Sequence, residues 1–469
     1  MGTNRYNIRH LARITVQAAT PIAIGSGEKD IETDAQIIRD VNDLPYIPAT
    51  AIAGVIRHAL GLTDKEDSTW GFQKKDKDNG EGSKVIFTDA NIIDSDGSVI
   101  DGLIADDEKS KFLKSFKRLP IRQHARIGHK GATEKGGKFD EEVCFKGTRF
   151  CFEMEMLDKA EDKAAEGTHK DDFKKIIDQI TNKPLRIGGG TRKGFGLLSV
   201  VSCKTVSLNL YDKSQLKQYI SKSSSLENSE FWKSAKELKT EDNPTGDYEC
   251  IKLVLEPESF FLFGSGRGDN EADMTPVSES VIVWNGNNAK FENNCLLIPA
   301  TSVKGALSHR VAYHYNRLTG IFADKIEDAK QHVGKKNDAV RMLFGSENGR
   351  EDERGIAGNV IISDVIESKT KEKILNHVAI DRFTGGAIDG ALFSEKVSDE
   401  TGRKFELTAL VDKGKVDALI AKKKKEEGSF DGEKVYKALD CALDDICKGM
   451  LPLGGGVNRG NGVFTGKRI

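Results

Sequence analysis

The sequence lacks the long apolar runs and paired cysteines that would point to a membrane or an oxidising compartment. No apolar run reaches the roughly 18 residues that a membrane-spanning helix needs. The N-terminal residues lack the apolar core of a secretory signal peptide. Seven cysteines are scattered without a CxxC pair, which argues against a disulfide framework and against a zinc site. We therefore expect a cytoplasmic protein with reduced thiols and no membrane partner.

The chain also lacks a strong net charge and the motifs of nucleotide-binding enzymes. Its formal net charge of −2 excludes a uniformly basic nucleic-acid binder, although a local basic groove stays compatible with it. No GxxxxGK[ST] loop occurs. The glycine clusters that do occur follow a helix-like segment and precede a strand-like one, which is the reverse of the order in a dinucleotide-binding fold. We expect no organic cofactor.

One glycine-rich stretch is present twice, as LRIGGGTRKGFGLL in residues 185–198 and as LPLGGGVNRGNGVF in residues 451–464. Both copies carry a basic residue, Arg192 or Arg459, which we place at matching positions. Three glycines allow positive φ and expose N–H groups that suit a phosphate. A lone cluster of this kind is also a common helix end and turn. The repetition favours phosphate contact and indicates two copies of one domain.

Further blocks recur in the same order, which indicates an internal duplication. Residues 44–60 (LPYIPATAIAGVIRHAL) match residues 296–312 (LLIPATSVKGALSHRVA) almost position by position. The blocks predict a first module in 1–212, a polar linker in 213–248 and a second module in 249–469.

Each copy has the predicted order strand, loop, helix, strand, basic hairpin, strand, helix, glycine turn, strand. This order is close to a βαββαβ plan. We predict an α+β protein of two tandem ferredoxin-like (RRM-like) modules with inserted hairpins. The helix after each Ile-Pro-Ala-Thr has a threonine, Thr50 or Thr301, at its expected N-cap. These threonines act either as caps alone or as part of an anion site at the helix N-terminus.

Together, the GSG turns, the IPATSVKGALSHR block, the DRFTGGAIDGALF segment and the late glycine turns resemble the RAMP superfamily. They are most similar to the backbone subunits of type III CRISPR effector complexes. Two modules in one chain resemble the fused double subunit of the type III-D variants. The resemblance covers nearly the whole chain except the linker and the insert in 62–84. It implies that the partners are guide CRISPR RNA, target RNA and other effector-complex subunits, and that base pairing supplies the sequence specificity.

The resemblance also implies roles for the basic hairpins and for individual residues. The hairpins around 126–138 and 382–393 would interrupt the guide–target duplex, unless they are ordinary solvated loops. The residues that we predict to contact RNA are Thr50, Arg57, Arg122, His124, Arg126, Gly188, Gly189, Gly190, Arg192, Lys193, Thr301, Ser302, Lys304, Arg310, Arg382, Gly454, Gly455, Gly456, Asn458 and Arg459.

In the family, an aspartate between the GSG turn and the following helix cuts target RNA. The resemblance places this role on Asp34, with Asp30 and Asp40 as neighbouring alternatives. The other interpretation is that Asp34 is an ordinary solvent-facing acid in a loop. The carboxylate would activate a ribose 2′-hydroxyl or hold a divalent metal, Mg or Mn, that does so. Either route predicts a 2′,3′-cyclic phosphate.

The second copy departs from this pattern. The register before SVIVW places Ser278 or Glu279 opposite Asp34, while Asp269 and Asp273 lie upstream. We favour Asp273 as the second catalytic acid, although a shifted loop would leave this module inactive.

Two alternatives stay open from the sequence. The chain could be a scaffold that binds guide RNA without cutting, or an endonuclease that processes guide precursors. The duplicated IPAT block and both glycine turns argue against the second alternative. No GGDD motif is present, which excludes the cyclic-nucleotide synthase subunit.

Overall fold

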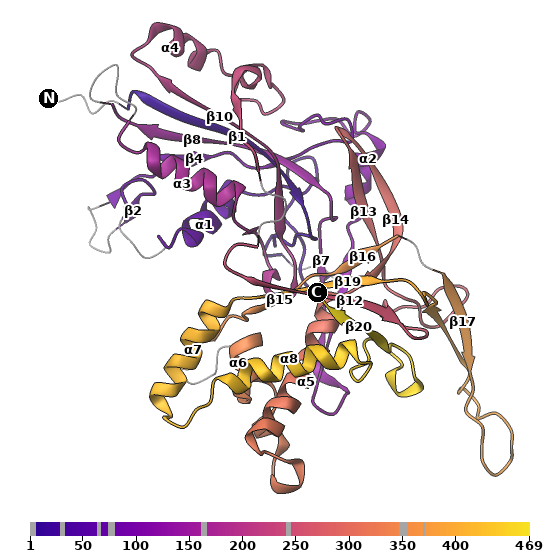
Figure 1. The fold of residues 1–469 in the computed structure, drawn as a ribbon. Coiled ribbons are helices and arrows are strands. Elements are labelled where there is room, and N and C mark those ends of the chain that lie inside the picture. The colour runs from indigo at the N-terminus through magenta and orange to yellow at the C-terminus, as the bar shows by residue number, and fades with distance from the viewer. Residues whose placement is uncertain are drawn as a thin grey trace.

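The protein has a mixed fold of helices and several antiparallel sheets, which confirms the predicted α+β class (Figure 1). The structure is a computed structural model that describes residues 6–28, 33–62, 67–73, 80–160, 167–240, 245–346, 355–368 and 371–469. Within these ranges, no helix is both long and apolar enough to cross a bilayer.

The first large sheet is built on one central strand. Its main path is β11-β10-β1-β8-β4. The bounds are β1 (Ile8–Ala18), β4 (Val85–Phe87), β8 (Arg149–Asp158), β10 (Leu197–Asn209) and β11 (Lys236–Glu237). The short strands β5 (Asn91–Ile92) and β9 (Leu185–Arg186) pair with β8 and β10. β1 alternates buried and half-buried side chains over most of its length, and α1 (Ala49–Ala59) and α3 (Lys170–Thr181) lie against the sheet.

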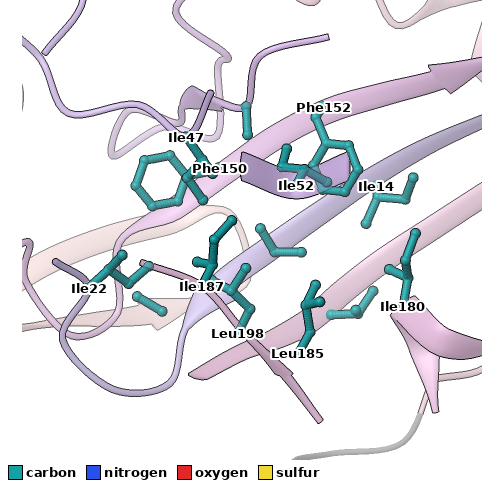
Figure 2. Packing of buried hydrophobic residues seen from close by; sticks show 14 of the residues in the cluster. Ile14, Ile22, Ile47, Ile52, Phe150, Phe152, Ile180, Leu185, Ile187 and Leu198 are labelled. Atoms are coloured by element: carbon teal, nitrogen blue, oxygen red, sulfur yellow. The ribbon is translucent and has the colours of Figure 1, made fainter. Parts of the chain in front are cut away.

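The core of this sheet is aliphatic and aromatic. Figure 2 shows Ile14 of β1, Phe150 and Phe152 of β8, Ile52 of α1 and Ile180 of α3 converging on one buried layer. Because the apolar faces of both helices and of the sheet meet there, this burial is the main stabilising contribution to the first half.

The second sheet repeats the arrangement of the first. Its path is β15-β19-β12-β20. The bounds are β12 (Glu249–Pro257), β15 (Val360–Ile362), β19 (Phe405–Val411) and β20 (Phe464–Arg468). The associated helices are α5 (Ala300–Thr319), α6 (Asp338–Phe344), α7 (Lys413–Glu426) and α8 (Glu433–Cys447). Numbered along the chain, the four corresponding strands have the spatial order fourth, first, third, second in both sheets.

Besides the short pair β2 (Phe72–Gln73) and β3 (Gly80–Glu81), the described residues form three longer hairpins. They are β6 (Ile121–Ile127) with β7 (Thr133–Glu142), β13 (Ser278–Asn285) with β14 (Asn288–Ile298), and β17 (Glu372–His377) with β18 (Phe393–Ser398). The hairpin β17–β18 projects away from the rest of the chain (Figure 1). β14 also pairs with β16 (Val365–Glu367).

Residues 213–240, the larger part of the segment 213–248 that was predicted as a polar linker, pack on the first sheet. It contains α4 (Lys213–Ile220), and β11 pairs with β10. Trp232 is 1% exposed, and its Nε1 donates a hydrogen bond to Glu153 at 2.6 Å. Burying this ring removes a large apolar area from water, which helps to hold an otherwise polar segment on the sheet together with Leu226, which is 3% exposed.

The first turns of α1 and α5 have the same construction, and it differs from the prediction. Both helices begin after a proline, and no side chain of that residue caps them. Instead, Asp89 Oδ1 accepts the N–H of the first residue of α1 at 2.7 Å, and Asp364 Oδ1 does so for α5 at 2.7 Å. The predicted N-cap role of Thr50 and Thr301 is therefore wrong.

The two halves share apolar and ionic contacts. Phe291 of β14 packs against Phe112, Phe116 and Phe145 of the first half, with ring centroids 5.1, 6.0 and 5.0 Å away. Ile282 of β13 belongs to the first core. The second half therefore completes the core of the first.

Candidate functional site

Two loops that carry the candidate acids occupy equivalent places. Each loop closes with a backbone bridge between the first glycine of a GSG turn and the residue three positions after the aspartate. Gly25 pairs with Ile37 in the first loop, and Gly264 pairs with Pro276 in the second. Asp34 and Asp273 are thus equivalent by backbone pairing, and both are exposed. The sequence register that placed Ser278 or Glu279 opposite Asp34 is wrong. The bridge between Gly264 and Pro276 makes Asp273 the equivalent residue, several positions before β13.

The rival acids of the second copy are already engaged. Glu279 is 4% exposed and accepts two hydrogen bonds from Arg122, at 2.9 and 2.6 Å. Asp269 accepts a hydrogen bond from Lys396 at 2.5 Å, and this lysine lowers the pKa of Asp269 to about 2. In the first copy, Asp40 accepts the N–H of Leu44 in a tight turn, while Asp30 lies outside the described residues.

Each candidate acid is tied to a hairpin strand. Asp34 Oδ2 accepts the N–H of Asp140 at 3.2 Å, and Asp140 Oδ1 accepts the N–H of Asp34 at 2.9 Å. Asp273 Oδ2 accepts the N–H of Ser394 at 2.8 Å and its hydroxyl at 3.1 Å. Asp140 is on β7 and Ser394 is on β18, so the same contact is made twice.

The donor set fits a divalent metal better at the first loop than at the second. Asp34 and Asp140 bring two carboxylates together, whereas Asp273 is joined by a hydroxyl. Magnesium is commonly held by one or two carboxylates together with substrate phosphates. In the described part of the chain, no group of three His, Cys, Asp or Glu side chains could hold a metal by itself. Two carboxylates alone would leave most coordination positions of a magnesium ion to ligands from outside these side chains.

The triple glycines are required by close packing of the backbone. Gly188 and Gly454 have φ of 83° and 95°. A Cβ on them would lie 2.4 Å from Ala23 O and 2.5 Å from Leu262 O. The middle glycine of each turn donates its N–H to that same carbonyl, at 2.5 and 2.6 Å. The glycines therefore dock each turn on the chain that follows β1 or β12, and one predicted phosphate donor is used internally.

The cation that matches Arg459 is Lys193. Counted from the first glycine of each turn, these two residues are equivalent, and each meets a glutamate of a hairpin strand. Lys193 Nζ is 3.1 Å from Glu141 Oε1, and an Arg459 guanidinium nitrogen is 2.6 Å from Glu395 Oε2. Arg192, which the sequence analysis paired with Arg459, contacts the Tyr248 hydroxyl instead at 3.3 Å.

A histidine and a phenylalanine complete each of these contacts. The His124 and Phe139 rings stack with centroids 4.8 Å apart and planes at 20°, and those of His377 and Phe393 stack at 4.8 Å and 21°. His377 Nε2 is 2.9 Å from Glu395. His124 Nε2 is 2.8 Å from Glu141 Oε1, at ion-pair distance but outside hydrogen-bond geometry.

We call these two groups the anchor clusters. The first anchor cluster is His124, Phe139, Glu141 and Lys193, and the second is His377, Phe393, Glu395 and Arg459. The sequence analysis missed His377 and both Phe–Glu pairs. The recurring signal was Phe-Asp-Glu in 139–141 and Phe-Ser-Glu in 393–395.

Comparison with known families supports the duplicated geometry. The model of the RAMP superfamily matches residues 15–199 and residues 254–465. The chain belongs to the RAMP superfamily. The two matched ranges of this RAMP protein contain both acid loops and both glycine turns.

Solved structures give a weaker likeness. The chain is similar to a subunit in "Type III-B Cmr-beta Cryo-EM structure of the Apo state", with a TM-score of 0.30 and 16% identity over 40% of this chain and 96% of that chain. The corresponding values for "Cryo-EM structure of the Type III-B Cmr-beta bound to cognate target RNA" are 0.31, 16%, 40% and 96%. No curated protein matches the chain.

Several predicted RNA-contacting residues of this RAMP protein instead hold the fold together. Arg122 is 6% exposed between Glu279 and Asp364, and Arg57 donates to the carbonyls of Leu62 and Gly71. Arg310 pairs with Asp445 of α8 at 2.5 Å. Arg122 is therefore buried, whereas Arg57 and Arg310 are half-buried and keep part of their side chains at the surface.

Lys304 joins the two halves. Its Nζ donates to the carbonyl of Arg192 in the first glycine turn at 2.5 Å and to that of Val360 in β15 at 2.7 Å. Burial, with a smaller effect of the Arg192 charge, lowers the pKa of Lys304 to about 8. This lysine acts as a bridge between the glycine turn and the second sheet.

Other predicted residues lie at the surface. Arg126 is exposed and forms an ion pair with Glu134 at 3.2 Å within its own hairpin. Thr50, Ser302, Arg382 and Asn458 are exposed, whereas Thr301 is half-buried. The surface positions near the acid loops and hairpins are those that an RNA strand could reach.

Proposed function

We propose that this RAMP protein is a fused double backbone subunit of a type III CRISPR effector complex, of the type III-D kind. Its two halves are tandem ferredoxin-like modules, supported by the identical order of the four corresponding strands in the two sheets. Each module binds the backbone of the guide RNA, and each cuts the complementary target RNA. The observation that carries the proposal is the equivalent placement of Asp34 and Asp273, both exposed and both tied to a hairpin strand.

The chemistry proposed for each acid is a transfer within the target strand. The carboxylate takes the proton of a ribose 2′-hydroxyl, and that oxygen forms a bond to the adjacent phosphorus. The bond from phosphorus to the 5′-oxygen breaks in line, and the leaving oxygen takes up a proton. The products are a 2′,3′-cyclic phosphate and a 5′-hydroxyl. In the alternative route, Asp34 and Asp140 would hold a magnesium or manganese ion, which would activate the hydroxyl and stabilise charge at the phosphate.

Further subunits are the proposed partners because equivalent surfaces differ between the halves. The first glycine turn packs on the second half, where a Cβ on Gly194 would lie 2.4 Å from Ile362 O. The first hairpin reaches α5, with Ile127 O 3.2 Å from His309 Nε2. In the second half, the turn around Gly460 is exposed and Phe383 in the hairpin is fully exposed. Ile380, Ile388 and Leu392 of the same hairpin are also exposed, and exposed apolar side chains gathered on one element mark a contact surface.

The proposal is tested with the assembled complex and a labelled complementary RNA. Asp34→Ala should remove one cleavage product and Asp273→Ala another, with guide RNA retained in both complexes. Loss of no product in either variant would leave a guide-binding scaffold as the function. Cleavage of repeat RNA by the isolated chain would favour the guide-processing endonuclease.

A further inference from the structure

We propose that the anchor clusters are positioning groups for the cutting aspartates, so that each glycine turn and each acid share one support. This inference rests on the proposed function, since it assigns a role in the same reaction. Neither cluster contains the proposed catalytic aspartate. The phenylalanine and the glutamate of each cluster lie on the hairpin strand that the aspartate contacts.

Successive side chains along β7 and β18 alternate between the two faces of the strand. The residue whose N–H binds the acid is Asp140 in one strand and Ser394 in the other. Its two neighbours point to the opposite face of the strand, because successive side chains alternate. Those neighbours are the phenylalanine and the glutamate of the anchor cluster. Each acid-binding amide is therefore held from both sides along the strand.

The histidine of each cluster connects the two strands across the hairpin. His124 pairs with Phe139 in the backbone register, and His377 pairs with Phe393. Ring stacking within these pairs adds side-chain contact to the backbone pairing. Each histidine also meets the glutamate two residues beyond its phenylalanine. The histidine thus fixes both ends of the three-residue segment that binds the acid.

The cation of each cluster connects the hairpin to the glycine turn. Lys193 and Arg459 each approach the glutamate and lie over the phenylalanine ring, 4.8 and 5.6 Å from its centroid. Glu395 is fully buried, and a buried carboxylate needs such partners. Burial alone would raise the pKa of Glu141, but His124 and Lys193 outweigh it and hold that pKa below its usual range. The cation is therefore bound to the glutamate. This contact fixes the position of the glycine turn relative to the hairpin strand.

The same arrangement of contacts occurs in both halves of the chain. The two clusters use different cations and different residues beside the acid, yet they keep the same stack, the same glutamate contact and the same acid contact. Other equivalent positions of the two hairpins differ, such as Arg122 and Leu375, so these four roles are kept where neighbouring positions are not.

The experiment uses the assembled complex and replaces each glutamate by its uncharged isostere. Glu141→Gln should slow the cut assigned to Asp34 about tenfold under single-turnover conditions, as expected when a positioned group shifts by a fraction of an ångström. The cut assigned to Asp273 should keep its rate. Glu395→Gln should have the opposite selectivity. Target affinity and guide content should not change, because the defect lies in position and not in binding.

Conservative exchanges between the copies are the matched controls. Lys193→Arg and Arg459→Lys preserve the cation and should keep both cuts near the wild-type rate, whereas Arg459→Met should slow the second cut only. Hydrogen exchange supplies a readout that does not depend on activity. The amide of Asp140 should exchange faster in Glu141→Gln, and that of Ser394 in Glu395→Gln, while the melting temperature shows whether each variant is folded.

The outcomes separate this inference from the proposed function. If the aspartate variants lose their products while both glutamate variants keep wild-type rates and exchange, the anchor clusters are ordinary structural contacts and the inference is overturned. If the aspartate variants keep all products, the proposed function is wrong. In that case, unchanged exchange in the glutamate variants would also overturn the positioning role.

Discussion

The two hairpins are built alike but surrounded differently. In β6–β7, Arg122 points into a buried ionic contact with Glu279 and Asp364 of the second half. The equivalent position on β17 is Leu375, two residues before the stacked histidine, and it is half-buried on the projecting hairpin. The same hairpin construction thus contacts the other half of the chain in β6–β7 and projects outward in β17–β18.

The helices that follow the IPAT blocks differ in the same way. Lys304 of α5 bridges to the first glycine turn, and its equivalent in α1 is Ala53, which lies with the apolar residues around the first core. A duplicated module therefore keeps its acid loop and anchor cluster and changes the residues that face the neighbouring module. Comparing the two halves therefore separates the residues proposed to act in cutting from the residues that join one half to the other.

The largest effect is expected from breaking the ionic joint. Arg122→Met leaves Glu279 and Asp364 buried without their cation, and removing one partner of a buried pair costs about 3–5 kcal/mol. Burial alone would lower the pKa of Arg122, but the two carboxylates outweigh it and raise that pKa, which shows how strongly they hold the charge. Chemical denaturation of the full chain measures the loss. Leu375→Met is the control, and an equal loss in both variants would contradict the assignment.

A smaller effect is expected at the lysine bridge. Lys304→Met leaves two carbonyls without their donor, at a cost of about 1–3 kcal/mol. The pKa of Lys304 is lowered from 10.5 to about 8, so between these pH values the unfolded chain binds more protons than the folded one. The Lys304 contribution to the free energy of unfolding should therefore grow from pH 8 to pH 10.5, so the stability difference between the wild type and Lys304→Met should widen over this range.

Denaturation midpoints at several pH values measure this difference. Ala53→Met, at the equivalent place in α1, should leave the pH dependence as it is in the wild type. A wild-type pH profile that Lys304→Met does not alter would show that the lysine is not desolvated by the joint.

The smallest effect concerns the metal requirement of the two cuts. Asp140→Asn removes one of two carboxylates, and the cut assigned to Asp34 should then need about tenfold more magnesium. Ser394→Asp should lower the magnesium requirement of the other cut. Titration of each product against magnesium measures both. Identical requirements in all variants would mean that Asp140 and Ser394 do not take part in metal binding.

The equivalence of the two acid loops could be predicted because short motifs repeat with near-constant spacing, while the division into two modules stays a prediction. Asp34 was placed by its loop, and Asp273 was favoured even though the apparent register pointed to Glu279. The register failed because the second loop pairs through Pro276 and not through β13. Backbone pairing of this kind has no sequence signal.

Other features depended on contacts between distant residues. The helix starts are capped by acids 40 and 64 positions away, so a local threonine was the natural but wrong choice. The anchor clusters join a hairpin to a turn, and stacking across the hairpin is visible only once the strands are paired. Arginines that looked available for RNA were taken by buried partners, because charge alone does not show which side of a strand faces the other half.

The most direct test of two equivalent cutting sites is to map the ends of one target RNA cut by complexes carrying Asp34→Ala or Asp273→Ala. The account predicts two wild-type cuts, each ending in a 2′,3′-cyclic phosphate, with each substitution removing one and leaving the other at its original position and rate. Loss of both cuts in one variant, or of neither in both, would contradict it.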